Sequence, residues 1–161
     1  MRAGTYLAVH FLKPCSAGDR FVADAWPLHI TLLPPFSVTG TVDEDALGSM
    51  LRQHAPMEVR IHEPARFGPR RDIPVNLVEE DGGLQALHEA LYGFFGEAGA
   101  SSREPRYVRA AYHPHVTVQK TGRVTAGDRV VIDSVAIVDR APGGDEGHRL
   151  VTRVHPLGEA G

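Results

Sequence analysis

Two five-residue strings in this chain repeat one pattern: Leu-His-Ile-Thr-Leu centred on residue 30, and Pro-His-Val-Thr-Val centred on residue 116. Alternation of polar and apolar residues is typical of a β-strand, in which successive side chains point to opposite faces. His29 and Thr31 then share one face of their strand, and His115 and Thr117 share one face of theirs. Two strands that each bury an apolar face and present an imidazole and a hydroxyl are predicted to form two halves of one catalytic cleft.

The length and amino-acid composition of the chain are those of an ordinary globular protein. Its 161 residues fit a single domain, residues 1–161, and 42% hydrophobic with 23% charged residues is a usual composition. No apolar run approaches the roughly 20 residues of a membrane-spanning helix, and no signal-peptide pattern opens the chain. The single cysteine, Cys15, excludes an internal disulfide. We therefore expect a cytoplasmic monomer that needs neither a membrane nor an obligate protein partner.

A formal net charge of −3 argues against a protein that coats nucleic acid, because such binding draws on clustered Lys and Arg. That charge leaves room for an enzyme that holds one terminal phosphate.

The hydrophobic pattern predicts a fold that mixes strands with two helices. Helices are expected at residues 83–98 and just after the acidic residues 43–45, ending before Pro56. Strands are expected at 5–12, 28–33 (stopped by Pro34-Pro35), 57–67, 73–79, 114–120, 129–138 and 148–155. The second motif follows the first by 86 positions, one in each half of the chain. The sequence thus predicts an α+β domain of two related lobes around a shared groove.

The paired motifs favour chemistry on a phosphodiester. Histidine titrates near pH 6.5, so two of them across a cleft can act as base and acid in one turnover. A hydroxyl two residues along each strand lies about 6–7 Å from its histidine, close enough to bind the same anion. Phosphodiester hydrolysis needs a deprotonated nucleophile, a protonated leaving oxygen and hydrogen bonds to the non-bridging oxygens. This scheme requires no metal or other cofactor.

These residues also resemble a family. Strand-borne His-x-Thr motifs flanked by apolar residues are similar to those of the 2H phosphoesterase superfamily, in its 2′-5′ RNA ligase/cyclic phosphodiesterase (LigT-like) branch. The resemblance implies a bilobal α+β fold with two pseudo-symmetric antiparallel-sheet lobes, helices outside and a central cleft. It also implies hydrolysis of 2′,3′-cyclic phosphates or related cyclic and 2′-5′ phosphodiesters, in RNA ends or small cyclic nucleotides, usually to a 2′-phosphate. Whether reversible 2′-5′ ligation occurs stays open.

The resemblance also implies roles for individual residues. His29 and His115 become the general acid and base, and Thr31 and Thr117 hold phosphate oxygens. Analogy favours His115 as the base that activates water, with His29 protonating the leaving oxygen. Many LigT-like proteins carry an arginine three residues after the second threonine, where this chain has Gln119 followed by Lys120. Lys120 would supply positive charge to the phosphate as a compact point charge rather than a planar fork.

Two other functions fit the same residues. One is a non-catalytic RNA- or nucleotide-binding module that retains the groove. The other is a metal-dependent hydrolase that uses His29, His113 and His115, since a His-x-His pair suits zinc. The hypothesis of a metal-dependent hydrolase lacks an obvious carboxylate or thiolate ligand and leaves both threonines unexplained.

Three further residues are predicted to be structural. His88 lies on the apolar stripe of the second helix and is expected in the core or at its boundary. Trp26 and Tyr112 precede the two motifs; aromatic residues there can stack on a base but more often pack a core.

Overall fold

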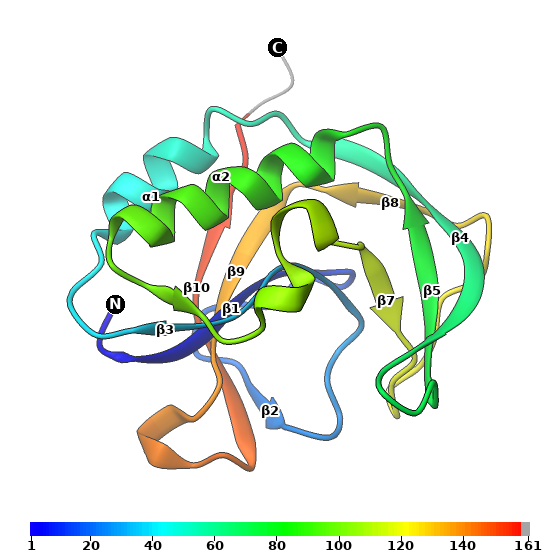
Figure 1. Cartoon of the computed structure of the whole chain (residues 1–161), viewed down its shortest axis with the longest axis horizontal. Helices are drawn as coiled ribbons and strands as arrows, with labels where there is room; N and C mark the ends of the chain where they lie inside the picture. The colour runs from blue at the N-terminus through cyan, green and yellow to red at the C-terminus, as the bar shows by residue number, and fades with distance from the viewer. Residues whose placement is uncertain (159–161) are drawn as a thin grey trace.

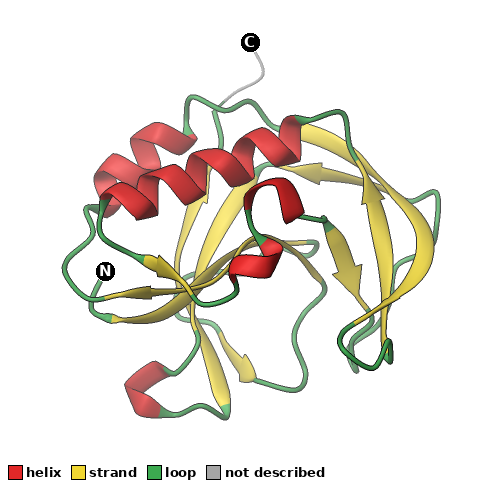
Figure 2. Ribbon diagram, viewed as in Figure 1, coloured by secondary structure: helices red, strands yellow, loops and turns green. Residues whose placement is uncertain are grey.

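The computed structural model describes residues 1–158, which form a strongly curved antiparallel sheet with two helices on one side (Figures 1 and 2). The two helices are α1 (Glu44–Leu51) and α2 (Gly83–Glu97). The strands are β1 (Gly4–Phe11), β2 (Arg20–Val22), β3 (His29–Val38), β4 (Met57–Phe67), β5 (Ile73–Glu79), β6 (Ser101–Ser102), β7 (His115–Thr117), β8 (Arg129–Ile132), β9 (Ser134–Asp139) and β10 (His148–Pro156). None of the helices in this part of the chain is long and apolar enough to cross a membrane.

The strands run in the order β2-β10-β9-β1-β3-β7-β5-β4-β8, with β6 paired to β3. β3 and β7, the two motif strands, are neighbours joined at a single register position, where Ile30 pairs with Val116. This position separates the lobe of β1, β2, β3, β9 and β10 from the lobe of β4, β5, β7 and β8. The fold is the two-lobed α+β arrangement that the sequence predicted, with the sheet continuous between the lobes.

Both helices cover the same face of the sheet (Figure 2). α1 begins after Asp43, whose side-chain oxygen accepts hydrogen bonds from the backbone N–H groups of Asp45 and Ala46 and so caps the helix. The apolar stripe of α2 is buried in the main core, which also holds Ile30 and Val116. A second, smaller core lies on the opposite face of the sheet, on β1, β9 and β10.

β3 is longer than predicted, because Pro34 and Pro35 do not end it. The pairing with β1 shifts register here: two residues lie between Leu33 and Phe36, whereas only one lies between their partners on β1, Ala8 and Tyr6. The bulge places the two prolines where the ladder is already interrupted, so their missing N–H groups cost no regular hydrogen bond. The carbonyl of Pro35 accepts a hydrogen bond from the N–H of Arg103 instead.

Three other boundaries also differ from the prediction. The continuous strand expected at 129–138 is two strands, because the chain turns at Asp133 and passes from β4 as neighbour to β1 and β10. The strand expected at 114–120 is only three residues long. The two-residue strand β6 lies in a segment expected to be a loop, and no strand was expected where β2 lies. These differences arise from long-range pairing, which local patterns do not record.

Candidate active site

The antiparallel register brings the two motifs together on the sheet face away from the helices. Ile30 and Val116 form the joining pair, and both are buried on the helix side. Their neighbours along each strand therefore point to the other face, where all four motif side chains are partly exposed.

The same register places His29 across from Thr117 and Thr31 across from His115. Residues directly across a strand pair have Cβ atoms about 5 Å apart, and diagonal ones about 7–8 Å apart. The two imidazoles thus lie on one diagonal of a small rectangle and the two hydroxyls on the other. That spacing leaves room for one tetrahedral anion between them.

Both imidazoles are held in the same way by the backbone two residues before them. Nδ1 of His29 lies 2.9 Å from the carbonyl oxygen of Pro27, and Nδ1 of His115 lies 2.8 Å from that of His113. Because a carbonyl can only accept, each Nδ1 carries a proton and donates it. Each neutral ring therefore has its lone pair on Nε2, where it can take a proton.

A close aromatic ring packs against each of these imidazoles, and His29 has a second, Phe11, whose ring centroid lies 6.1 Å from its own. The Trp26 ring lies 4.6 Å from that of His29, and the Phe67 ring lies 4.6 Å from that of His115, between ring centroids. Trp26 also belongs to the edge of the smaller core, as the core interpretation predicted, and the guanidinium of Arg149 lies 5.9 Å above its ring. Phe67 was not identified from sequence, because it ends β4, far from the second motif along the chain.

These apolar neighbours leave the two imidazoles poorly hydrated. Burial lowers the pKa of His29 to about 4, against the opposing hydrogen bond to Pro27, and the nearby charge of His115 lowers it further. Burial is also the largest cause that lowers the pKa of His115, followed by the opposing bond to His113 and the charge of that residue. Both rings are therefore neutral at pH 7 in the ligand-free protein.

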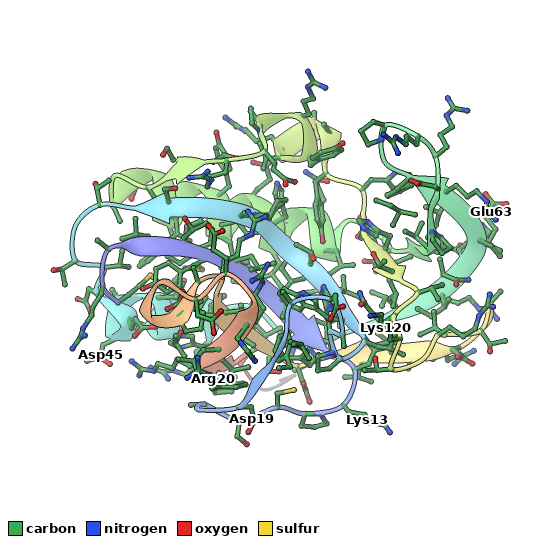
Figure 3. The ribbon with its side chains drawn as sticks, turned by 90° about the horizontal axis from the view of Figure 1, so that it is seen from below. Lys13, Asp19, Arg20, Asp45, Glu63 and Lys120 are labelled. Carbon is green, nitrogen blue, oxygen red and sulfur yellow. The ribbon has the colours of Figure 1, made fainter. Side chains whose placement is uncertain are left out.

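Lys120 lies beside the motif face but is already engaged. It follows β7, and its Nζ lies 2.8 Å from Oδ2 of Asp24, in the loop before β3, with both side chains about 70% exposed (70% and 71%). Figure 3, which shows the molecule of Figure 1 from below, places Lys120 to the right of the middle, near the start of β3. The next residue, Thr121, donates a hydrogen bond to the carbonyl of Trp26, so the two loops pack together.

The residues of the metal-site alternative are not assembled as ligands. Within residues 1–158 no three His, Cys, Asp or Glu side chains are grouped so that they could hold a metal ion. His113 is exposed and lies against the Phe67 ring, 5.4 Å between centroids. The geometry thus gives the set His29, His113 and His115 no support.

Two cavities lie away from the motif residues. One, of about 440 Å³, is lined by Leu12, Val124 and residues 128–131. The other, of about 370 Å³, lies at the end of β1 beside His10, Cys15 and Ser134. Neither is lined by a motif residue.

Comparison with solved structures identifies the class of fold. The chain is similar to a crystal structure of a phosphoesterase, with 16% sequence identity, coverage of 97% of this chain and 99% of the other, and a TM-score of 0.59. It is also similar to E. coli LigT complexed with NADP⁺ (13% identity, 99% and 100% coverage, TM-score 0.57). A third similar structure, a protein of Thermus thermophilus, gives 17% identity, 98% and 100% coverage and a TM-score of 0.55. The fold is that of the LigT-like 2H phosphoesterases.

A sequence match to the 2′-5′ RNA ligase superfamily spans residues 8–136, which include both motifs and the whole of α2. The chain belongs to this superfamily. No sequence among the curated proteins matches it.

Proposed function

We propose that this protein is a metal-independent phosphodiesterase that hydrolyses 2′,3′-cyclic phosphates, or related cyclic and 2′-5′ phosphodiesters, of RNA ends or small nucleotides. The observation that carries the proposal is the matched pair of imidazoles. Each is bonded at Nδ1 to a carbonyl and has Nε2 available, on one face with two hydroxyls. The substrate is the only partner required, and the enzyme acts as a cytoplasmic monomer.

His29 and His115 supply the two proton transfers. One imidazole removes a proton from the attacking water, and the other protonates the leaving ribose oxygen. Thr31 and Thr117 donate hydrogen bonds to the non-bridging phosphate oxygens, on which negative charge develops. Lys120 adds positive charge at the edge of the site if phosphate draws it from Asp24.

The acid needs a proton that the ligand-free site does not hold at pH 7, since burial lowers the pKa of both histidines. A phosphate anion between the rings raises the pKa of each, because an opposite charge favours the protonated form. The substrate thus recruits the proton that its own leaving group receives. The pH–rate profile is expected to be bell-shaped, with one histidine neutral and the other protonated at the optimum.

The proposal is tested by measuring hydrolysis of 2′,3′-cyclic nucleotides and cyclic-phosphate-ended RNA in EDTA. Wild type is compared with His29→Ala and His115→Ala, and with His62→Ala as a control because that histidine is exposed on β4. We expect activity in EDTA, a loss of about 10²- to 10⁴-fold in kcat for each motif variant, and none for the control.

The other functions give different results. A wild type that binds cyclic nucleotides without turnover supports the binding-module interpretation. Activity that EDTA removes and zinc restores supports a metal-dependent hydrolase. Activity indifferent to both motif substitutions contradicts the proposed site.

A further inference from the structure

Two stacked rings on the helix side of the sheet connect the motif strands to each other. His88, on α2, is fully buried, and Tyr112, three residues before His115, lies parallel to it. Their ring centroids are 4.2 Å apart with an interplanar angle of 4°. His88 is predicted to lie in the core or at its boundary and Tyr112 to pack in the core, and both are buried. Their polar atoms, however, all bond to backbone close to a motif.

His88 uses both of its nitrogens. Nδ1 lies 2.8 Å from the carbonyl oxygen of Leu32 on β3, and Nε2 accepts a hydrogen bond of 2.7 Å from the backbone N–H of Arg109. Because a carbonyl only accepts and an amide N–H only donates, the ring is neutral with its proton on Nδ1. One side chain thus ties β3, one residue after Thr31, to the segment that leads into β7.

Tyr112 makes the second connection. Its hydroxyl donates a hydrogen bond of 2.8 Å to the carbonyl oxygen of Thr31, in the motif of the other lobe. Within the sheet, β3 and β7 are joined only at Ile30 and Val116. The stacked pair, which we call the brace (His88 and Tyr112), adds a connection between the same strands from the other side.

The backbone at Arg109 shows how firmly α2 fixes the chain ahead of the second motif. Arg109 has φ 57°, a left-handed conformation that a residue with a side chain rarely adopts. Besides the bond to His88, its carbonyl accepts 2.7 Å from Nε2 of Gln85, and its side chain lies 3.4 Å from Glu89 and over the Tyr92 ring. Such a conformation persists where the surroundings determine it. The direction in which the chain enters the second motif is therefore set by α2.

We propose that the brace is a positioning element that sets the distance and orientation between the His-Thr pair of β3 and that of β7. The inference rests on the proposed function. Neither residue contacts the substrate, because both lie on the helix side of the sheet. Their effect is on alignment, and a displacement of about 1 Å at a catalytic site can reduce the rate about 100-fold.

The test is Tyr112→Phe, which keeps the stacked ring and removes only the hydroxyl that reaches Thr31. Tyr92→Phe is the matched control, because it also removes one tyrosine hydroxyl. Tyr92 lies on α2 with Arg109 above its ring, and its hydroxyl makes no hydrogen bond to residues 1–158. With a 2′,3′-cyclic nucleotide, we expect Tyr112→Phe to lower kcat about 10- to 100-fold and to change KM less than about twofold. Tyr92→Phe should behave as wild type.

A second pair of variants separates positioning from loss of fold. His88→Asn keeps an N–H donor near the Nδ1 position for the Leu32 carbonyl, whereas His88→Leu keeps none. We expect the Asn variant to retain more kcat per folded molecule than the Leu variant. Equal kcat per folded molecule in wild type, Tyr112→Phe and His88→Leu overturns the proposal.

Histidine ¹⁵N NMR without substrate distinguishes failure of this inference from failure of the proposed function. If wild type hydrolyses nothing but Tyr112→Phe shifts the imidazole resonances of His29 and His115, the positioning role stands and the proposed reaction fails. If wild type is active and the substitution changes neither those resonances nor kcat, the brace has no positioning role.

Discussion

The two motif strands reach the same local geometry with very different support. β3 has ten residues and a long pairing with β1, whereas β7 has three residues and meets β3 at one position. Yet the Nδ1-to-carbonyl distances, 2.9 and 2.8 Å, and the aromatic contacts, 4.6 Å in both, agree closely. The short strand is paired with β5 at all three of its residues, and the brace ties the segment before it to α2 and to β3. Equivalent sites therefore need equivalent geometry and not equivalent surroundings.

The largest effects should come from the joining pair itself. Ile30→Ala removes a fully buried side chain from the well-supported strand, and we expect it to lower the free energy of unfolding by about 2–5 kcal/mol. Val116→Ala, which removes fewer atoms, should cost about 2 kcal/mol. Urea unfolding measures both, and a larger loss for Val116→Ala would mean that β7 depends on this contact more than the comparison implies.

At acid pH, the protonation of His29 should destabilise the folded protein more than the protonation of His115. Burial lowers the pKa of both His29 and His115, so the unfolded chain binds more protons than the folded protein below about pH 6.5. The contribution of the two histidines to the free energy of unfolding is fully present above that pH. It falls as the pH drops toward 4, by at most about 1.4 kcal/mol per pH unit for each histidine.

His29→Gln should flatten this loss between pH 6.5 and 4 more than His115→Gln does, because the pKa of His29 falls to about 4. Urea unfolding at a series of pH values makes the comparison. The same slope in wild type and His29→Gln would contradict the low pKa.

The two hydroxyls, in contrast, are expected to be equivalent. Thr31→Val and Thr117→Val keep the shape and remove one donor each, and we expect each to lower kcat/KM about 10- to 100-fold, as for a hydrogen bond to a charged group. The double variant should lose less than the product of the two, because both donors bind one phosphate. Steady-state kinetics with a cyclic nucleotide measures kcat/KM for each variant. Thr31→Ser and Thr117→Ser, which keep the hydroxyl, are the controls and should retain kcat/KM. A large effect at one threonine alone would show that the halves differ in function.

The smallest effect on catalysis is expected from substitution of Lys120. This residue follows the second motif closely in sequence, and the first motif has no such lysine. Lys120→Ala should raise KM by a few-fold at low salt and less at high salt, since exposed charges are screened. Asp24→Asn, which frees the lysine, should lower KM under the same conditions. If neither substitution changes KM at low salt, Lys120 has no part in phosphate binding.

Local alternation was enough to predict much of this molecule. The strands at 57–67 and 73–79 were predicted with their observed bounds, and the two helices nearly so. The motif faces followed from the same alternation, because Ile30 and Val116 had to be buried. A period of two along a strand is a local property, so the sequence records it directly.

Contacts between distant segments could not be predicted in this way. Nothing in the sequence near His115 indicates that Phe67 packs on it, or that Tyr112 bonds to Thr31. The turn at Asp133 was missed for the same reason, since the residues on both sides continue one apolar pattern. The bulge at Pro34 depends on its partner strand as well. Each of these features belongs to two segments at once.

The antiparallel pairing of the two motif strands distributes the site over both halves of the chain. Since His29 lies across from Thr117 and Thr31 across from His115, each of the two sides that cross between the strands takes one residue from each motif. Neither half of the chain contains both imidazoles or both hydroxyls. A single copy of the motif strand could build the same arrangement only by pairing with a second copy about a two-fold axis, as in an isologous dimer. This chain carries that dimer within one polypeptide.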